Sequence, residues 1–340
     1  MSEDHSSTAI AIDESEFTQL AERHRRELQV HCYRMLGSFE DSEDLVQETY
    51  LRAWRARSSF EGRSTVRAWL YRIATNACLD HLGRVARNPI ARRQPAFSME
   101  ATPSGSDQTE VPWLSPFPDK LLDQVAPADA EPDSLVIARE TIELAFLVAI
   151  QHLPPQQRAT LILRDVLAWS ANETALALNI SVASANSALQ RARATLKDRL
   201  PAERAEWGPS TDPSEAERAL LQQCVEALEK ADPNRFAELL RTDVRVTMPP
   251  DALWILGRDA FVAGLMAQFD PQSPAYFGEW RAMPTRANRQ PAVAGYVRRP
   301  GEADFTPQVL NVFRLEQGMI AEITAFGPEV FADFGLPATL

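Results

Sequence analysis

One stretch of the sequence interleaves aromatic and basic side chains in a way that suits unpaired nucleic-acid bases. Trp69, Tyr71, Arg72 and Asn76 follow closely on one another inside residues 55–93, which hold nine arginines and two acids. Aromatic rings can stack on bases while guanidinium groups pair with phosphates. The alternative is that the two rings are ordinary core residues of a helix. The pattern therefore indicates either a surface for single-stranded nucleic acid or a packed helix.

A second stretch, residues 167–200, has the pattern of a helix-turn-helix. Ser170 and Glu173 form a capping box, Asn179 tolerates the left-handed corner, and Ser181 can cap the next helix. The second helix would turn small and apolar residues inward and a polar, basic face outward, which fits a DNA major groove. A plain helical hairpin with a solvated face is the alternative. The outward residues are Ser184, Asn186, Ser187, Gln190, Arg191 and Arg193.

Acidic residues are concentrated at the start of another predicted helix, within residues 40–54, for which Ser42 is the expected N-cap. Carboxylates near a helix N-terminus are stabilised by the helix dipole by roughly 0.3–1 kcal/mol each. This effect accounts for some of them. The same helix carries Leu51 and Trp54 on an apolar stripe. The crowded residues are Glu40, Asp41, Glu43, Asp44 and Glu48, with Gln47 among them.

No residue spacing predicts a metal or redox site. The three cysteines, Cys32, Cys78 and Cys224, lie far apart in the sequence and form no Cys-x-x-Cys or Cys/His pattern. We expect all three to be reduced core residues. No cofactor and no catalytic residue is expected.

The distribution of charge matters more than its sum. The net charge of −12 alone argues against a nucleic-acid partner. However, residues 55–93 and 182–200 are basic, and the acidic stretch 99–134 lies between them. Nucleic acid therefore remains a candidate partner of the two basic stretches.

The sequence does not indicate a membrane protein. No apolar run approaches the ~20 residues that span a bilayer, and the first residues lack the basic and apolar parts of a signal peptide. We expect a cytoplasmic protein with no membrane partner.

The elements that must position these residues fall into successive domains. Helical periodicity runs through the first ninety residues and resumes after a linker rich in Pro, Ser and Asp. After residue 214, one helix is followed by alternating stretches that predict strands at 244–248, 308–315 and 319–326, with a hairpin turn at 316–318. We predict helical domains at 15–90 and 135–204, a linker at 91–134 and an α+β domain at 214–337.

The linker contains an apolar segment. Trp113, Leu114 and Phe117 stand close together among its polar residues. A fully solvated linker has little use for such side chains. We expect this segment to dock, either on its own chain or on a partner.

These blocks resemble known families. HCYRMLGSFEDSEDLVQETYLRAW with FEGRSTVRAWLYRIATNACLDHL resembles region 2 of sigma-70 factors, and QRATLILRDVLAWSANETALALNISVASANSALQRARATL resembles region 4. Their order, without the regions that separate them in housekeeping sigma factors, resembles the extracytoplasmic-function (ECF) layout. VTMPPDALWILGRDAF and IAEITAFGPEVFADFGLP resemble a SnoaL-like (NTF2-like) domain.

The resemblance implies a role for each block. The acidic helix would bind the β′ clamp helices of core RNA polymerase through Asp44, Gln47, Glu48, Leu51 and Trp54. The aromatic-basic helix would open and hold the −10 element through Arg67, Trp69, Tyr71, Arg72 and Asn76. The outward residues of the helix-turn-helix would read the −35 element. Many members have Lys or Arg where this chain has Asn186 and Ser187, which leaves the base preference at −35 open.

The resemblance also implies the overall fold and activity. We expect two all-α sigma domains and a cone-shaped α+β domain in a non-enzymatic sigma factor, with the last domain modulating activity by folding back on the sigma core. A small ligand or an anti-sigma protein is a further candidate partner. The cavity of the last domain would be lined by Met248, Asp251, Trp254, Trp280 and Tyr296, unless these are plain core residues. Two alternatives stay open: a helix-turn-helix regulator with a ligand-binding tail, and an enzyme with a buried acid in the tail.

Overall fold

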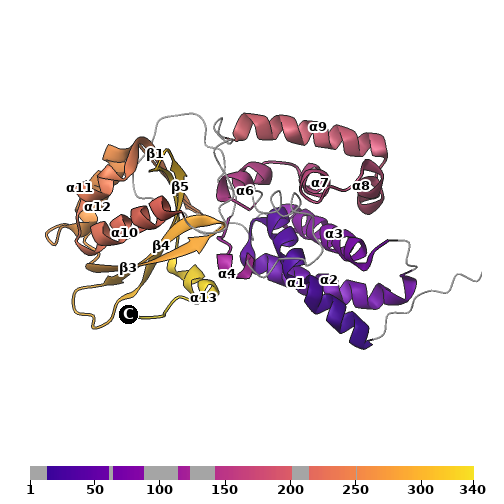
Figure 1. The fold of residues 1–340 in the computed structure, drawn as a ribbon, viewed down its shortest axis with the longest axis horizontal. Helices are drawn as coiled ribbons and strands as arrows, with labels where there is room; N and C mark the ends of the chain where they lie inside the picture. The colour runs from indigo at the N-terminus through magenta and orange to yellow at the C-terminus, as the bar shows by residue number, and fades with distance from the viewer. Residues whose placement is uncertain (1–13, 61–63, 88–113, 123–141, 201–213, 250) are drawn as a thin grey trace, which may run out of the picture. The chain divides into compact units, whose positions relative to one another are not determined.

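The computed structural model describes residues 14–60, 64–87, 114–122, 142–200, 214–249 and 251–340. The chain divides into two compact units (Figure 1). The first unit comprises Met1–Arg93 and Leu121–Trp207, and the second comprises Gln94–Lys120 and Gly208–Leu340. The linker between the two helical domains is therefore shared between the units.

The first helical domain is a bundle of three long helices. They are α1 (Glu14–Leu36), α2 (Phe39–Ala56) and α3 (Val66–Arg87), with a 3₁₀ turn, η1 (Arg57–Ser59), after α2. The prediction that Ser42 caps α2 is wrong. Ser38 has the extended backbone of an N-cap and accepts a hydrogen bond from the Asp41 amide, so the helix begins earlier. Ser42 is buried inside it and donates to the Phe39 carbonyl.

The second helical domain contains the predicted helix-turn-helix. Helices α6 (Leu144–Gln151) and α7 (Pro155–Leu161) lead through a π-helical turn, η4 (Ile162–Val166), to α8 (Ala171–Leu178) and α9 (Val182–Arg199). The capping box of Ser170 and Glu173 is present, and Ser181 caps α9. Asn179 has φ 52° and ψ 48°, as expected at the corner. The predicted motif is confirmed.

The C-terminal domain is α+β, as predicted. Helices α10 (Glu215–Glu229) and α11 (Pro233–Glu238) precede β1 (Leu240–Met248) and β2 (Asp251–Leu256), and α12 (Arg258–Phe269) follows. The remaining elements are β3 (Glu279–Ala287), β4 (Gln290–Arg298), β5 (Thr306–Glu316), β6 (Met319–Phe326), η6 (Pro328–Val330) and α13 (Phe331–Phe334).

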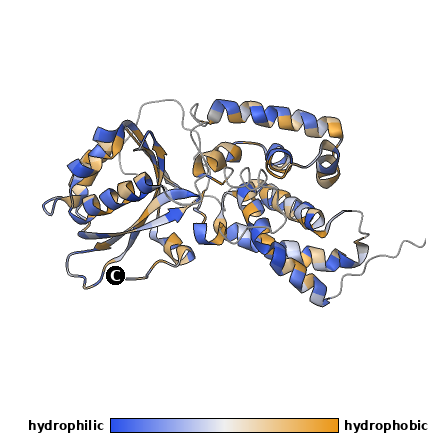
Figure 2. Ribbon diagram, viewed as in Figure 1, coloured by the Kyte–Doolittle hydropathy of each residue, from blue (hydrophilic) through white to orange (hydrophobic). Residues whose placement is uncertain are grey.

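The six strands form one sheet in the order β2-β1-β6-β5-β4-β3, with β1 and β6 parallel and the other neighbours antiparallel. Helices α10, α11 and α12 bury residues such as Cys224, Phe236 and Leu265 in one core with Trp280 and Phe313 of the sheet. In Figure 2 the helices of both units carry hydrophilic and hydrophobic residues in turn, as expected for helices with one buried side.

The apolar linker segment docks within its own chain. A short helix, α4 (Asp119–Leu122), follows Pro118, which forms an isolated antiparallel bridge with Ala287 at the end of β3. Leu114 and Phe117 are buried. Trp113 lies outside the described residues. The prediction of docking is therefore confirmed, and the binding site is the edge of the C-terminal sheet.

Candidate polymerase and promoter interfaces

The predicted polymerase-binding residues of α2 share one side of the helix. Asp44, Gln47 and Leu51 are exposed, and Leu51 keeps 52% of its surface in solvent. Gln47, Leu51 and Trp54 line a shallow pocket of about 450 Å³ together with residues of α1. An exposed leucine beside a carboxylate and an apolar pocket forms a surface suited to a partner that is basic and partly apolar.

The other two residues predicted for this surface have intramolecular partners. Glu48 accepts a 2.7 Å hydrogen bond from Arg52, which also binds Asp80 of α3 at 2.7 Å. The Trp54 ring stacks edge-on against Phe17 at 5.2 Å, and the Arg57 guanidinium lies 3.6 Å above it. The contacts of Trp54 hold one wall of the pocket in place.

The predicted −10 residues differ sharply in exposure. Trp69 and Tyr71 are 4% and 3% exposed, and Trp69 packs against Phe60 with 5.1 Å between ring centroids. Arg72 is exposed, and Arg67 keeps 45% of its side chain in solvent. The structure therefore brings the five residues to one helix, where the two arginines are exposed, Asn76 is half-buried and both rings are buried.

A polar network lies beneath this helix. Glu27 of α1 accepts hydrogen bonds from Arg67 at 2.8 Å and from the Tyr71 hydroxyl at 3.1 Å, and it also contacts His24. Burial favours the neutral acid, but the hydrogen bonds from His24 and Arg67 prevail and hold the pKa of Glu27 below its ordinary value. Burial and the negative charge of Glu27 raise the pKa of Tyr71. Tyr71 is thus a neutral hydrogen-bond donor held in the network.

All six predicted −35 residues of α9 are exposed, and Ala185, Leu189 and Leu196 anchor the opposite side. Arg193 pairs with Asp165 through bonds of 2.9 and 2.6 Å. The Ser184 hydroxyl lies 2.9 Å from that of Ser181. A polar surface thus runs along α9, and one of its two arginines is already held by an acid.

Two of the residues predicted to line a tail cavity, Trp280 and Tyr296, lie apart. Trp280 packs in the helix-side core against Phe269 and Phe277. Tyr296 packs against Phe331 and donates to the Pro337 carbonyl. Strand alternation in the uninterrupted β3–β4 register puts these two rings on opposite faces of the sheet, so they cannot line one cavity. Met248 is half-buried at the end of β1, and the side chains of Asp251 and Trp254 lie outside the described residues.

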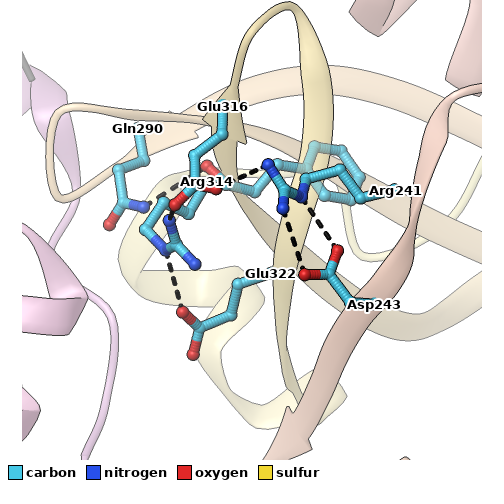
Figure 3. A network of polar contacts seen from close by, with 7 residues as sticks. Arg241, Asp243, Gln290, Arg314, Glu316 and Glu322 are labelled. Carbon is cyan, nitrogen blue, oxygen red and sulfur yellow. Dashed lines mark hydrogen bonds and ion pairs between the residues drawn. The ribbon is translucent and has the colours of Figure 1, made fainter. Parts of the chain in front are cut away.

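A network of ion pairs crosses the sheet and was not anticipated from the sequence (Figure 3). Arg314 binds Glu322 at 3.0 Å and contacts Glu316, while Arg241 binds Asp243 at 2.9 Å and Glu316 at 3.0 Å. The network joins residues of β1, β5 and β6, which are neighbours only in the folded sheet. Each of its carboxylates is paired with an arginine.

The docked linker makes polar contacts with the β3–β4 turn. The Phe117 amide donates to the Asn288 side chain at 2.7 Å, and the Asn288 amide donates to the Phe117 carbonyl at 2.9 Å. Asp119 accepts from the Arg286 guanidinium at 3.1 Å and from the Arg289 amide at 2.8 Å. Burial raises the pKa of Asp119 above its ordinary value. The turn residues have positive φ, 56° at Asn288 and 61° at Arg289.

The cysteines are free and buried, as predicted. Burial, together with the neighbouring Cys32 of α1, raises the pKa of Cys78 of α3. Within the described ranges, no group of three His, Cys, Asp or Glu side chains could hold a metal ion. None of the helices in those ranges is both long and apolar enough to cross a membrane.

Comparison with known families matches each block. Residues 20–88 match the Sigma-70 region 2 family, residues 143–196 match Sigma-70, region 4, and residues 221–323 match the SnoaL-like domain. The chain is 41% identical to the ECF RNA polymerase sigma factor SigG of Mycobacterium tuberculosis over 96% of this chain and 85% of that protein.

More distant relatives cover the chain differently. The ECF RNA polymerase sigma factor SigW of Bacillus subtilis is 28% identical over 55% of this chain and 90% of its own length. The crystal structure of the extracytoplasmic function sigma factor SigJ of Mycobacterium tuberculosis superposes with a TM-score of 0.58 at 22% identity, covering 94% of this chain and 99% of SigJ. SigJ thus shares the fold, C-terminal domain included. The chain belongs to the ECF RNA polymerase sigma factors of the sigma-70 family and carries a SnoaL-like domain at its C-terminal end.

Proposed function

We propose that this chain binds core RNA polymerase and directs it to specific promoters. The observation that carries the proposal is the face of α2, where Asp44, Gln47 and Leu51 are exposed beside an apolar pocket. A regulator that acted through its helix-turn-helix alone would have no need of such a face. The role requires binding surfaces and no catalytic residue.

The polymerase surface comprises Asp44, Gln47, Glu48, Leu51 and Trp54, and its partner is the pair of β′ clamp helices. The exposed carboxylate attracts a basic partner, and Leu51 and the pocket rimmed by Trp54 add apolar contact. The Arg52–Glu48 bond supports this arrangement, because it holds the adjacent turn of α2 against Asp80 of α3.

The −35 surface is the exposed face of α9, with Ser184, Asn186, Ser187, Gln190, Arg191 and Arg193. Helix α9 begins at Val182, so the first four of these residues lie in its first two to three turns. In a helix-turn-helix, the N-terminal part of the second helix contacts base edges. Asn, Gln and Ser can all hydrogen-bond bases, and arginines reach bases or phosphates.

The −10 surface is α3, with Arg67, Trp69, Tyr71, Arg72 and Asn76. The solvent-exposed guanidinium groups of Arg67 and Arg72 support initial contact with phosphates. The two rings are buried, so base stacking on them requires a change in their surroundings. Stacking on aromatic rings stabilises captured bases by about 1–3 kcal/mol each.

The SnoaL-like domain modulates activity by holding the linker that joins regions 2 and 4. Its support is the docked segment, in which Phe117 is fully buried and Asp119 pairs with Arg286. Docking holds one point of the linker at a fixed position. Without docking, only the length of the linker limits the position of that point. A small ligand or an anti-sigma protein that prefers the docked or the released state would shift the balance between them.

Core binding by a charge-reversed α2 tests the polymerase surface. Asp44→Lys/Glu48→Lys should reduce capture of core polymerase at least tenfold, because a basic partner would meet two like charges. Asp259→Lys/Asp304→Lys is the matched control, since both residues are exposed acids of the C-terminal domain. Equal capture by the two variants and the unaltered chain would refute the assignment.

A further inference from the structure

The exposed face of α9 has an uncharged middle row of three residues. At about 100° of rotation per residue, Ala183, Ser187 and Gln190 lie within about 60° of one another around the helix axis. All three are exposed, and the buried Ala185 and Ala192 lie on the opposite side of the helix. Ala183 was not among the residues predicted to read the −35 element. The middle row therefore consists of two short side chains and one amide.

The two arginines of this face lie at its margins. Arg191 and Arg193 are rotated roughly 70–90° from the middle row, one to each side. Arg193 is bound to Asp165 of η4 by hydrogen bonds of 2.9 and 2.6 Å, which hold it at its margin. In a major groove the base edges lie in the middle and the phosphates along both sides. A helix that turns its middle row toward the bases therefore brings both arginines to the phosphates.

The side chains of the middle row are available for contact with DNA. Among the described residues, no hydrogen bond engages the side chain of Ser187 or Gln190. A glutamine can pair with N6 and N7 of adenine, and an alanine methyl group can contact the methyl group of thymine. Guanine is most often recognised by arginine or lysine. Neither residue type occurs in the middle row.

The spacing of the row fits a short stretch of base pairs. From Ala183 to Gln190 the helix rises about 10 Å, which is close to three base pairs at about 3.4 Å each. Helix α9 begins at Val182, so Ala183 lies in its first turn, in the part of such a helix that contacts bases. The short side chains of Ala183 and Ser187 allow the helix to approach the base edges closely.

We infer that α9 reads the −35 element through A·T base pairs. Gln190 recognises an adenine, the methyl group of Ala183 contacts the methyl group of a thymine, and Arg191 and Arg193 contact phosphates. The inference rests on the proposed role of α9 as the −35 surface, and it names the bases that this surface recognises.

Base analogues in a promoter fragment test the inference with the protein unaltered. The fragment is one from which core polymerase with the full chain makes run-off RNA, and its affinity for that complex is measured at fixed salt. Deoxyuridine lacks the methyl group of thymine, and 7-deazaadenine lacks the N7 acceptor. At one −35 thymine, deoxyuridine should weaken binding about threefold, as expected for one methyl contact. At one −35 adenine, 7-deazaadenine should weaken binding about tenfold.

Variants assign each effect to a side chain. Gln190→Ala should abolish the effect of 7-deazaadenine, and Ala183→Gly should abolish the effect of deoxyuridine. Gln156→Ala, which alters an exposed glutamine of α7, should preserve both effects. Thermal melting identifies a variant that unfolds, and the analogues with the unaltered chain then carry the test.

The same measurements can overturn the inference. Weaker binding when 7-deazaguanine replaces a −35 guanine would show that guanine is read instead. Full affinity with both the thymine and the adenine analogues would also overturn it, as would a 7-deazaadenine effect that persists in Gln190→Ala. A chain that directs transcription from no genomic fragment would instead refute the proposed function.

Discussion

His31 is fully buried between α1 and α3, where its Nε2 lies 2.9 Å from the Thr75 hydroxyl. Its Nδ1 has no hydrogen-bond partner among the described residues. Burial, with Arg34 and Arg67 nearby, lowers the pKa of His31 to about 3. A neutral imidazole at this position is therefore part of the region 2 fold.

This pKa predicts a loss of stability in mild acid. The folded-state pKa lies below the ordinary value of 6.5, so the folded chain resists protonation and the free energy of unfolding falls as pH drops below 6.5. Between pH 7 and pH 5 the loss from this residue is about 2 kcal/mol. Urea unfolding followed at region 2 should show that loss in the unaltered chain and a smaller one in His31→Gln. Equal losses in both would contradict the role assigned to His31.

The two arginines of α9 predict unequal effects on promoter binding. Both side chains are exposed, but Arg193 must give up its Asp165 partner before it can contact DNA, whereas no acid among the described residues pairs with Arg191. Arg191→Ala should therefore weaken binding of the polymerase complex by about 1–3 kcal/mol, more than Arg193→Ala does. Arg191→Lys separates the roles, because lysine keeps a phosphate contact but loses bidentate base recognition. A larger effect at Arg193 than at Arg191 would show that the exposed face is misassigned.

The exposure of a side chain could be predicted from the sequence where it depends on a single helix. The exposed face of α9 follows from helical period alone, and all six predicted residues are exposed. Trp69 and Tyr71 show the limit, since their burial depends on Phe60, α1 and region 4. The proximity of Cys32 to Cys78 could likewise not be predicted from their spacing, because the two residues lie on different helices.

At the scale of elements, local signals predicted the helix-turn-helix and the β5–β6 hairpin. The capping box, the Asn179 corner and the two-residue turn of Gln317 and Gly318 each act within a few residues. Strands β2, β3 and β4 were not predicted. Eight of the nine residues of β4 are buried, so it lacks the alternation that marks a half-exposed strand.

The docked linker predicts a specific pattern of backbone protection. Phe117→Ala/Asp119→Ala removes a fully buried ring and an ion pair, so the segment should leave the sheet edge. Hydrogen exchange of the Phe117 and Asn288 amides should then speed up at least tenfold. Asp304→Ala, a change at an exposed acid of the same domain, should leave exchange unaltered. Unchanged protection in the double variant would contradict docking as the cause.

At the scale of the whole molecule, the order of the domains was predictable and the binding site of the linker was not. Phe117 and Asn288 are separated by 171 positions, and nothing local to either residue identifies the other. The apolar residues of the linker nevertheless predicted that part of it would be buried. Through this contact the C-terminal domain binds the linker between the two DNA-binding regions. The contact is the basis of the role in modulation proposed for that domain.

The central claim is that this chain gives core polymerase its promoter choice, and run-off transcription tests it most directly. Core polymerase from the source bacterium is incubated with pooled genomic fragments, with and without the chain, and RNA 5′ ends are mapped. The account predicts a shared set of start sites that appears only with the chain and disappears with Asp44→Lys/Glu48→Lys. RNA identical to that made by core polymerase alone, from a chain shown to be folded, would contradict it.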